Sequence, residues 1–212
     1  MSEQLFITAT GTEIGKSYYV QKICANYKKE NKKFFAIKPV ISGFDVNDEN
    51  NDSSLILKSL NLENNLENLD KISPWRFEEA LSPNIAAKLE NKEIDLDKVI
   101  NFCQQEINKA KEKNTNLLIE GAGGVMTPIN DKFTYLDLIK KLQIPAILVT
   151  ANYLGTISHT LTAIKILENE GIKIAKIILN CKEKEIDYRQ NLENLKNFTD
   201  VKIEILDSVN RT

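Results

Sequence analysis

Six runs of consecutive apolar residues recur along the chain, and longer segments with a single apolar stripe separate them. The runs cover residues 5–9, 34–40, 117–120, 144–151, 174–179 and 201–206. They are nearly continuous in apolar residues rather than alternating, which is typical of parallel strands covered on both faces. The sixth run, VKIEIL, is interrupted by charged residues and predicts the weakest strand.

The intervening segments predict amphipathic helices. In residues 95–111 and 156–169 apolar side chains recur at spacings of three and four, which places them on one face of a helix. Strands that alternate with helices predict an α/β fold, with a doubly wound, mostly parallel sheet and helices on both faces. Residues 45–51 predict a polar loop, and residues 61–70 predict a helix end and a loop. No linker interrupts the pattern, so residues 1–212 predict one domain.

Composition and charge exclude several classes of function. A net charge of −2 gives no electrostatic basis for binding nucleic acid. No run of 18 apolar residues predicts a membrane span, and MSEQLFITA lacks the basic and apolar regions of a secretion signal. Three widely spaced cysteines fit reduced thiols in the cytoplasm. The single histidine, His159, rules out a histidine-based metal cluster and argues against a Ser-His-Asp triad.

The stretch ITATGTEIGKS, residues 7–17, ends like a phosphate-binding P-loop but starts differently. The usual pattern has a glycine five residues before Gly15, where this chain has Thr10, and Gly11 comes one residue late. A strand, a loop and then Lys16-Ser17 opening a helix form the right context for an anion, and Ser17 is placed to bind Mg²⁺. The alternative is a plain turn with a chance match; the context favours nucleotide binding and a P-loop NTPase-like fold.

A second lysine motif follows the second predicted strand. Lys38-Pro39-Val40 and Ser42-Gly43 lie at its carboxyl end, the edge at which open α/β sheets bind ligands. Lys38 would point toward the same mouth as Lys16, and two lysines there suit a substrate with more negative charge than the nucleotide alone. A surface lysine before a turn-forming proline is an equally good interpretation of the spacing.

An acidic, glycine-rich loop, Glu120-Gly121-Ala122-Gly123-Gly124, follows the third predicted strand. An acid at a strand end beside a P-loop can hold Mg²⁺ directly or through water, and the glycines allow the backbone to approach a ligand closely. The alternative is a loop that needs positive φ angles. For Asp52 a helix N-cap is the commoner explanation. Asn180 could contact a base edge or cap its strand.

Together these stretches resemble the dethiobiotin synthetase family. The resemblance runs from about Leu5 to Asn180 through TGTEIGKS, KPVISG, LSPNIAAKLE, IEGAGGVMTPI, LDLIKKLQIPAILV and NYLGTISHTL. It implies a cytoplasmic, ATP-dependent cyclo-ligase of biotin biosynthesis. Such an enzyme converts 7,8-diaminononanoate, CO₂ and ATP to dethiobiotin, ADP and phosphate through a carbamate and a carbamic–phosphoric anhydride. The implied partners are these small molecules and a second copy of the chain, with neither nucleic acid nor membrane.

The resemblance also implies roles for individual residues. Lys16 and Lys38 would be catalytic, and Ser17, Asp52 and Glu120 would bind Mg²⁺. Thr12 and Ser42 would contact the diamine. The remaining nucleotide contacts would be Glu13, Ile14, Gly15, Tyr18, Gly121, Ala122, Gly123, Asn180 and Cys181, with Asn180 at the adenine. Tyr153, Leu154, Gly155 and Ser158 would meet the substrate carboxylate across a homodimer interface.

Three features depart from the family pattern. The family loop is one residue longer than the usual P-loop, and Ala9 stands where it commonly begins with glycine. Ser158 stands where many relatives have asparagine. The adenine-binding Gly-x-x-Pro stretch expected after the sixth strand is not evident in IEILDSVNRT.

Two other classes of function fit a P-loop fold. A regulatory ATPase of the septum-positioning or plasmid-partition type would use nucleotide-dependent dimerisation. Those proteins usually have an extra lysine early in the loop, where this chain has Thr10-Gly11-Thr12, and often a C-terminal membrane-binding helix, which VNRT does not predict. A nucleotide-sensing module would bind without turnover. Corrinoid-modifying amidoligases are related but are usually longer.

Overall fold

Every strand of the main sheet runs parallel to its neighbours in the computed structural model, which describes residues 2–181 and 187–206. The strand order is β2-β5-β1-β6-β7-β8. The strands are β1 (Gln4–Ala9), β2 (Phe34–Ile37), β5 (Asn116–Glu120), β6 (Ala146–Ala151), β7 (Ile174–Asn180) and β8 (Ile203–Leu206). A separate parallel pair consists of β3 (Val40–Ser42) and β4 (Trp75–Phe77).

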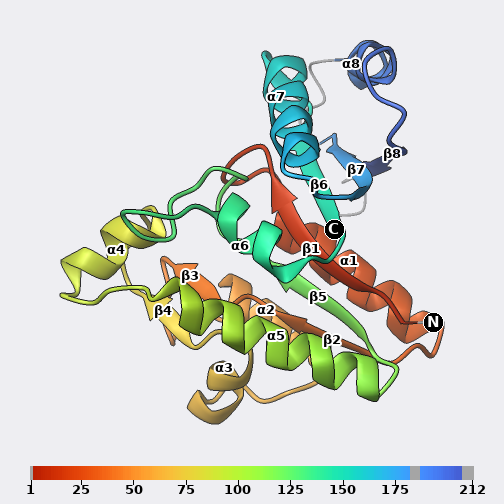
Figure 1. Ribbon diagram of the computed structural model, residues 1–212. Helices are drawn as coiled ribbons and strands as arrows, with labels where there is room; N and C mark the ends of the chain where they lie inside the picture. The colour runs from red at the N-terminus through yellow and green to blue at the C-terminus, as the bar shows by residue number, and fades with distance from the viewer. Residues whose placement is uncertain (1, 182–186, 207–212) are drawn as a thin grey trace.

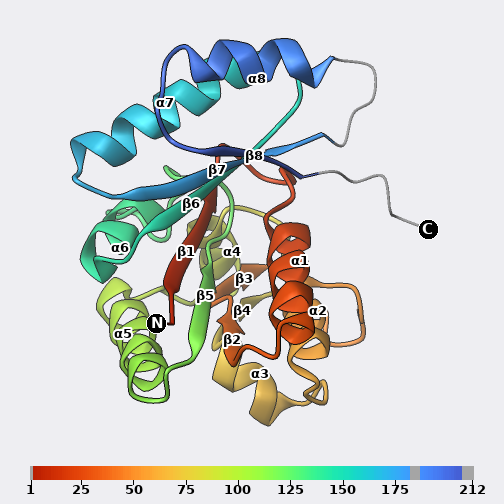
Figure 2. The ribbon, with the colours of Figure 1, turned by 90° about the vertical axis from the view of Figure 1, so that its right-hand side faces the viewer.

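Helices cover both faces of the main sheet. Figures 1 and 2 show α1 and α2 on one side and α5, α6 and α7 on the other, so the predicted doubly wound fold is confirmed. The short helix α4 lies beside β3 and β4, away from the sheet. The helices are α1 (Lys16–Lys29), α2 (Asp52–Leu60), α3 (Leu66–Ile72), α4 (Pro83–Leu89), α5 (Leu96–Glu112), α6 (Tyr135–Leu142), α7 (Thr156–Asn169) and α8 (Tyr188–Lys196).

The core is centred on β1, β5 and β6. All five residues of β5 are buried, as are the last five of β1 and the first five of β6. A strand between two helical layers must present apolar side chains to both, which explains the continuous apolar runs. Each fully buried aliphatic or aromatic side chain, such as Phe6, Ile119 or Leu148, contributes about 1.5–3 kcal/mol.

The predicted strand at residues 34–40 is interrupted in the structure. It ends at Ile37, and β3 begins at Val40 in the separate pair. Pro39 has no N–H to donate to a ladder, and the N–H of Lys38 donates instead to Ile72 O at 3.0 Å. The chain therefore leaves the main sheet at Lys38, which places this lysine at the carboxyl edge.

The interpretation of residues 61–70 as a helix end and loop is only half right. Helix α2 ends at Leu60 and Asn61 adopts a left-handed conformation, but α3 begins at Leu66. The side chain of Asn65 accepts a hydrogen bond from the Asn68 N–H at 2.9 Å and so caps α3. Asparagines that suggested a loop therefore start a helix, because their short amide side chains satisfy its first N–H groups.

None of the helices among the described residues is long and apolar enough to cross a membrane.

The strand order places β1 at the centre, with β5 on one side and β6 on the other. Chain connections leave this point in opposite directions, and the loops after β1, β2 and β5 meet there. Open α/β sheets bind ligands at such a switch point.

Candidate active site

The loop between β1 and α1 has the geometry of an anion site. Gly15 precedes α1 with φ 105° and provides no side-chain cap, so the first N–H groups of α1 stay available. Glu13 also has a positive φ, 57°. The buried Lys16 side chain folds back over the loop, and its Nζ donates to Gly11 O at 3.1 Å. The first N–H groups of α1 and the Lys16 ammonium are therefore hydrogen-bond donors of the same loop.

Two glycines are needed where other parts of the chain press against this loop. A Cβ at Gly15 would lie 2.3 Å from Asn180 Nδ2, and a Cβ at Gly124 would lie 3.1 Å from Gly11 N. The Asn180 amide donates to Ile14 O at 2.9 Å, so β7 holds the loop from behind. Ala9 is still part of β1 and is fully buried, and its carbonyl accepts from Val125 N at 3.0 Å. Glycine is therefore not required at residue 9.

A buried ion-pair cluster lies at the floor of the site. Lys38 Nζ donates to a carboxylate oxygen of Asp52 and to Glu120 Oε1, the latter at 2.8 Å. Ser17 Oγ donates to the same Glu120 oxygen at 2.7 Å. Lys38 and Glu120 are only 4% and 1% exposed, so these charges depend on one another for solvation. Lys38 is therefore not a surface lysine before a turn.

Asp52 does not cap its helix, contrary to the commoner explanation of its position. It is the first residue of α2, and the cap is Asn51, whose side chain accepts from Ser54 N at 2.9 Å. Because Asn51 satisfies the helix end, the Asp52 carboxylate is left to face Lys38.

The two site lysines have opposite pKa shifts. Burial, followed by repulsion from Lys38, lowers the pKa of Lys16 to about 8. Burial would also lower the pKa of Lys38, but the carboxylates of Glu120 and Asp52 outweigh it and raise the pKa above the ordinary value. The same attraction to Lys38 overcomes burial and lowers the pKa of Asp52. Lys38 therefore keeps its positive charge, whereas Lys16 loses its positive charge as the pH rises through about 8.

The oxygen groups beside Lys38 fit a hard divalent cation. Glu120 Oε2 is buried and has no hydrogen-bond partner, which leaves one oxygen of this carboxylate available as a ligand. Ser17 and Asp52 supply further oxygen atoms, the ligand type that Mg²⁺ prefers. Within residues 2–181 and 187–206, no group of three or more His, Cys, Asp or Glu side chains lies close enough together to hold a metal ion. Two carboxylates and a hydroxyl match a cation that shares its coordination with phosphate oxygens and water.

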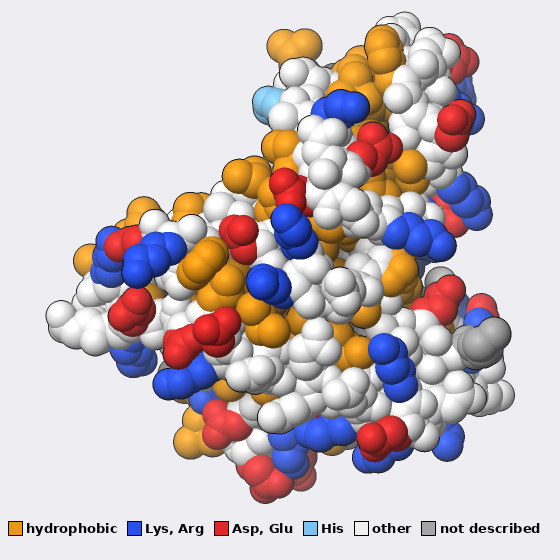
Figure 3. All heavy atoms as spheres, viewed as in Figure 1, with side chains coloured by type: hydrophobic (Ala, Val, Ile, Leu, Met, Phe, Trp, Pro, Cys, Tyr) orange, Lys and Arg blue, Asp and Glu red, His pale blue; other side chains and the backbone are white. Residues whose placement is uncertain are grey.

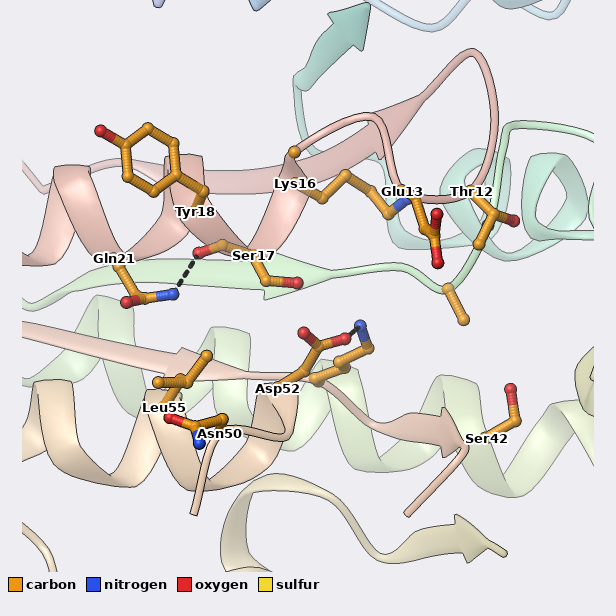
Figure 4. A pocket seen from close by; sticks show the side chains of 14 residues that line it. Thr12, Glu13, Lys16, Ser17, Tyr18, Gln21, Ser42, Asn50, Asp52 and Leu55 are labelled. Carbon is orange, nitrogen blue, oxygen red and sulfur yellow. Dashed lines mark hydrogen bonds and ion pairs between the residues drawn. The ribbon is translucent and has the colours of Figure 1, made fainter. Parts of the chain in front are cut away.

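Lys16, Ser17, Lys38 and Asp52 line one cavity of about 930 Å³, large enough for a nucleotide and a small second substrate. Glu120 is buried next to this cavity, in contact with Lys38 and Ser17. Figure 4 shows Lys16, Ser17, Thr12 and Glu13 on one side of the cavity and Asp52 and Ser42 on the other. The lining residues are Thr12, Glu13, Gly15, Lys16, Ser17, Tyr18, Gln21, Lys38, Ser42, Asn50, Asp52, Leu55, Ala122 and Gly123. Segments predicted from three separate strand ends therefore meet in one place.

Other predicted nucleotide residues support the loops from outside the cavity. Gly121 lies beneath the Phe6 and Tyr135 rings, whose nearest carbons would be 3.1 and 3.2 Å from a Cβ there. Ile14 packs on the core, and Cys181 N donates to Leu206 O at 3.2 Å. The Asn180 side chain touches the P-loop rather than open space, although its Oδ1 is buried without a partner.

The segment predicted to contact the substrate carboxylate, residues 153–158, does not line this cavity. It lies at the start of α7, where Leu154 is 94% exposed and Ser158 is also exposed. Tyr153 Oη and His159 Nδ1 are 2.8 Å apart. Within one chain this segment and the P-loop cavity are separate surfaces.

Sequence reasoning missed three residues of the cavity wall, Gln21, Asn50 and Leu55. Gln21 lies one turn after Ser17 and its Nε2 donates to Ser17 O at 3.2 Å, so helical spacing from the P-loop serine could have indicated it. Asn50 and Leu55 flank Asp52 on the loop and first turns of α2. They could have been found only by accepting Asp52 as a site residue.

Comparison with known proteins finds a matching family and several relatives. The sequence profile of a family described as AAA domain matches residues 3–209. The chain is 38% identical over 177 residues to an ATP-dependent dethiobiotin synthetase of Acidiphilium cryptum, covering 82% of this chain and 78% of the relative. The synthetase of Methanocaldococcus jannaschii is also 38% identical, with 84% and 79% covered. That of Caulobacter vibrioides is 36% identical over 198 residues, with 92% and 88% covered.

Among solved structures, the chain is similar to the MinD cell division protein of Aquifex aeolicus. The TM-score is 0.59 at 18% identity, covering 99% of this chain and 84% of that one. The MinC:MinD complex of the same organism gives a TM-score of 0.56 at 17% identity, with 99% and 83% covered. At these identities the likeness shows a shared P-loop fold and nothing about activity.

Proposed function

This chain belongs to the ATP-dependent dethiobiotin synthetase family, and on that premise we propose that it is a dethiobiotin synthetase of the cytoplasm. It carboxylates 7,8-diaminononanoate with CO₂ and closes the ureido ring at the expense of ATP. The observation that carries the proposal is the placement of Lys38 between Asp52 and Glu120 at the floor of the P-loop cavity. In that arrangement the Lys38 ammonium, which can bind a negatively charged carbamate, lines the same cavity as the P-loop.

The P-loop side of the cavity holds the triphosphate. The first N–H groups of α1 face the phosphates, and Lys16 leaves Gly11 O to neutralise the β and γ groups. Ser17, Asp52 and Glu120 would hold Mg²⁺, which when bound supplies charge neutralisation between the phosphates. No protein nucleophile is required, because the carbamate oxygen of the substrate attacks the γ-phosphate.

Lys38 and the small polar residues orient the second substrate. Thr12 and Ser42 lie on opposite walls of the cavity beside Lys38, which suits two amino groups held next to the γ-phosphate. The Lys38 ammonium stabilises the negative charge of the carbamate and of the phosphoryl transition state. The second amine then closes the five-membered ring and releases phosphate. A site with buried walls also limits hydrolysis of the labile anhydride.

We further propose a homodimer in which residues 153–158 of one copy complete the site of the other. Figure 3 shows hydrophobic atoms on both the α4 and α7 flanks of the molecule. Large apolar side chains in and next to these two helices are exposed. A second hollow of about 490 Å³ lies between α7 and the loop after Gly124. The exposed side chains are Leu81, Ile85, Leu89, Met126 and Leu154.

Leu154→Asp should weaken this dimer and raise the KM for the diamine. A charge placed in an apolar interface costs several kcal/mol unless it is paired. Sedimentation velocity across protein concentrations measures the association constant. The matched control is Leu66→Asp, since Leu66 is 65% exposed at the start of α3, and Figure 1 shows α3 at the opposite end of the molecule from α7. If Leu154→Asp, Leu66→Asp and wild type had equal association constants, the start of α7 would not be part of the dimer interface.

ATP affinity should fall as the pH rises through about 8. Lys16 has its pKa lowered to about 8, so its positive charge is present below that pH and is lost above it. Bound phosphates stabilise the charged form, so binding at alkaline pH takes up a proton. Titration calorimetry in buffers of different ionisation enthalpy measures that uptake. Lys16→Arg keeps its charge and should show a flat profile over pH 7–9; an equally flat wild-type profile would contradict the prediction.

The test of the whole proposal is ATP consumption with and without the diamine and bicarbonate. A synthetase requires both, whereas a regulatory ATPase hydrolyses ATP alone and responds to a protein partner. A nucleotide-sensing module shows binding with no turnover in any mixture. The curated relatives favour the synthetase, since the likeness to MinD concerns fold alone. Turnover without diamine would refute the proposal.

A further inference from the structure

Four threonine hydroxyls form a cluster where β6 ends. Thr150 is its centre: its Oγ1 lies 2.8 Å from Thr160 Oγ1, 3.0 Å from Thr156 Oγ1 and 3.4 Å from Thr10 Oγ1. Thr150 and Thr160 are fully buried, and Thr156 is 1% exposed. Thr10 lies in TGTEIGKS, and Thr156 and Thr160 lie in NYLGTISHTL, but none of the four was assigned a role in the predicted site.

The hydrogen-bonding capacity of this cluster can be satisfied completely. Thr156 Oγ1 donates to Ala151 O at 2.6 Å, so its proton is used there. Thr150 can then donate to Thr156 and accept from Thr160 and Thr10, which uses its one proton and both lone pairs. A threonine hydroxyl buried in a strand is unfavourable unless it is bonded in this way.

Apolar side chains would be the simpler choice at this place. The three residues before Thr150 in β6 are Ile147, Leu148 and Val149, all buried. Valine has the shape of threonine and would avoid burying a hydroxyl. We therefore look for a role of the Thr150 hydroxyl in the segments that it contacts, which contain Thr10 and Thr156.

The cluster connects the P-loop of one proposed site to the segment that would complete the site of the partner copy. On one side is Thr10, which opens the P-loop; its N–H also donates to Val149 O at 3.0 Å, and the next carbonyl, Gly11 O, accepts from Lys16. On the other side is Thr156, the first residue of α7, directly after residues 153–155. Figures 1 and 2 show β6 beside β1, with α7 following from its end.

We propose that Thr150 is a positioning residue that couples the P-loop to the start of α7, so that nucleotide binding fixes the segment that receives the diamine. The substrate side of this inference rests on the proposed function. When the phosphates draw Lys16 away from Gly11 O, the P-loop start adjusts, and the hydroxyl cluster transmits its new position to Thr156. The coupling is a difference in substrate affinity between the nucleotide-free and nucleotide-bound protein.

The test compares Thr150→Val, which removes only the hydroxyl, with Thr150→Ser, which keeps it. The matched control is Thr8→Val, a buried threonine on neighbouring β1 outside the cluster. We expect Thr150→Val, which removes all three hydrogen bonds of this hydroxyl, to raise the diamine KM about ten-fold. The Kd for an ATP analogue without diamine should stay within about two-fold, and Thr150→Ser should restore most of the loss.

Hydrogen exchange gives a readout that does not depend on diamine turnover. The non-hydrolysable analogue adenylyl imidodiphosphate with Mg²⁺ should slow amide exchange in residues 153–160 of wild type and of Thr8→Val. Thr150→Val should lose that protection at a temperature well below its melting point, while its analogue affinity remains close to wild type. If wild type consumed no ATP with the diamine, the proposed function would fail, yet this exchange experiment would still test the coupling.

Two results would overturn the inference. One is nucleotide-induced protection of residues 153–160 in Thr150→Val equal to that of wild type. The other is a matching loss in Thr8→Val, which would attribute the effect to threonine removal from the sheet in general.

Discussion

Lys38→Gln should lower turnover about 10²–10³-fold and leave ATP affinity within a few-fold of wild type. The ammonium lies between Asp52 and Glu120, where the carbamate and the γ-phosphate would meet. An electrostatic contact that strengthens only as charge develops affects turnover rather than ground-state binding. Single-turnover phosphate release with saturating diamine measures the chemical step, and calorimetry measures ATP binding.

Lys38→Gln should also lower the stability of the protein in the absence of substrates. Without Lys38, the buried Glu120 carboxylate loses its ammonium partner, and breaking a buried pair costs about 3–5 kcal/mol. The melting temperature should therefore fall and should recover in part with Mg²⁺ and ATP. Lys176→Gln is the matched control, since Lys176 pairs with Glu204 at 2.9 Å outside the cavity. Near-normal turnover in Lys38→Gln would refute its assigned role; Lys16→Gln should weaken ATP binding as well.

Gly15→Ala should weaken ATP binding by about 30- to 150-fold. The new Cβ would lie 2.3 Å from Asn180 Nδ2, so the asparagine must move and release Ile14 O. Alanine at φ 105° adds strain of about 1–2 kcal/mol. Together with one lost hydrogen bond of about 1 kcal/mol, the total corresponds to roughly two powers of ten.

Gly171→Ala separates strain from contact. Gly171 also has a positive φ, 68°, but a Cβ there would meet nothing within 4 Å. That variant should lose about 1 kcal/mol of stability and keep wild-type ATP affinity. Fluorescent-nucleotide titration of both proteins, with thermal melts, makes the comparison. Equal affinities in Gly15→Ala and wild type would mean that the P-loop tolerates a displaced Asn180.

The parts of the fold that the sequence predicted best are those where burial dictates the pattern. β1, β5 and β6 are covered on both sides, so nearly every residue had to be apolar, and the runs were visible without further information. The P-loop and the Glu120 loop were visible because phosphate and metal chemistry restricts residue types at fixed spacings. Whether Lys38 was a surface residue or a site residue remained open, because spacing does not report burial.

Features that depend on a few tertiary contacts could not be predicted. β4 has three residues and exists through its pairing with β3, which begins only because Pro39 ends the ladder of β2. The hydroxyl cluster around Thr150 joins residues 140 positions apart in sequence. Asp52 looked like a cap because its neighbour Asn51 has the same capability, and the sequence does not say which of the two takes the helix end.

The central place of β1 has a consequence for how the protein is made. β1 leaves the ribosome before both of its partner strands, which are residues 116–120 and 146–151. The N–H and C=O groups of β1 therefore have no strand partners until residues 116–120 and 146–151 have been translated, and contacts this distant in sequence form slowly. Chaperone demand during synthesis should therefore be set by this one strand, and a circular permutant that starts just before β5 should fold with less assistance.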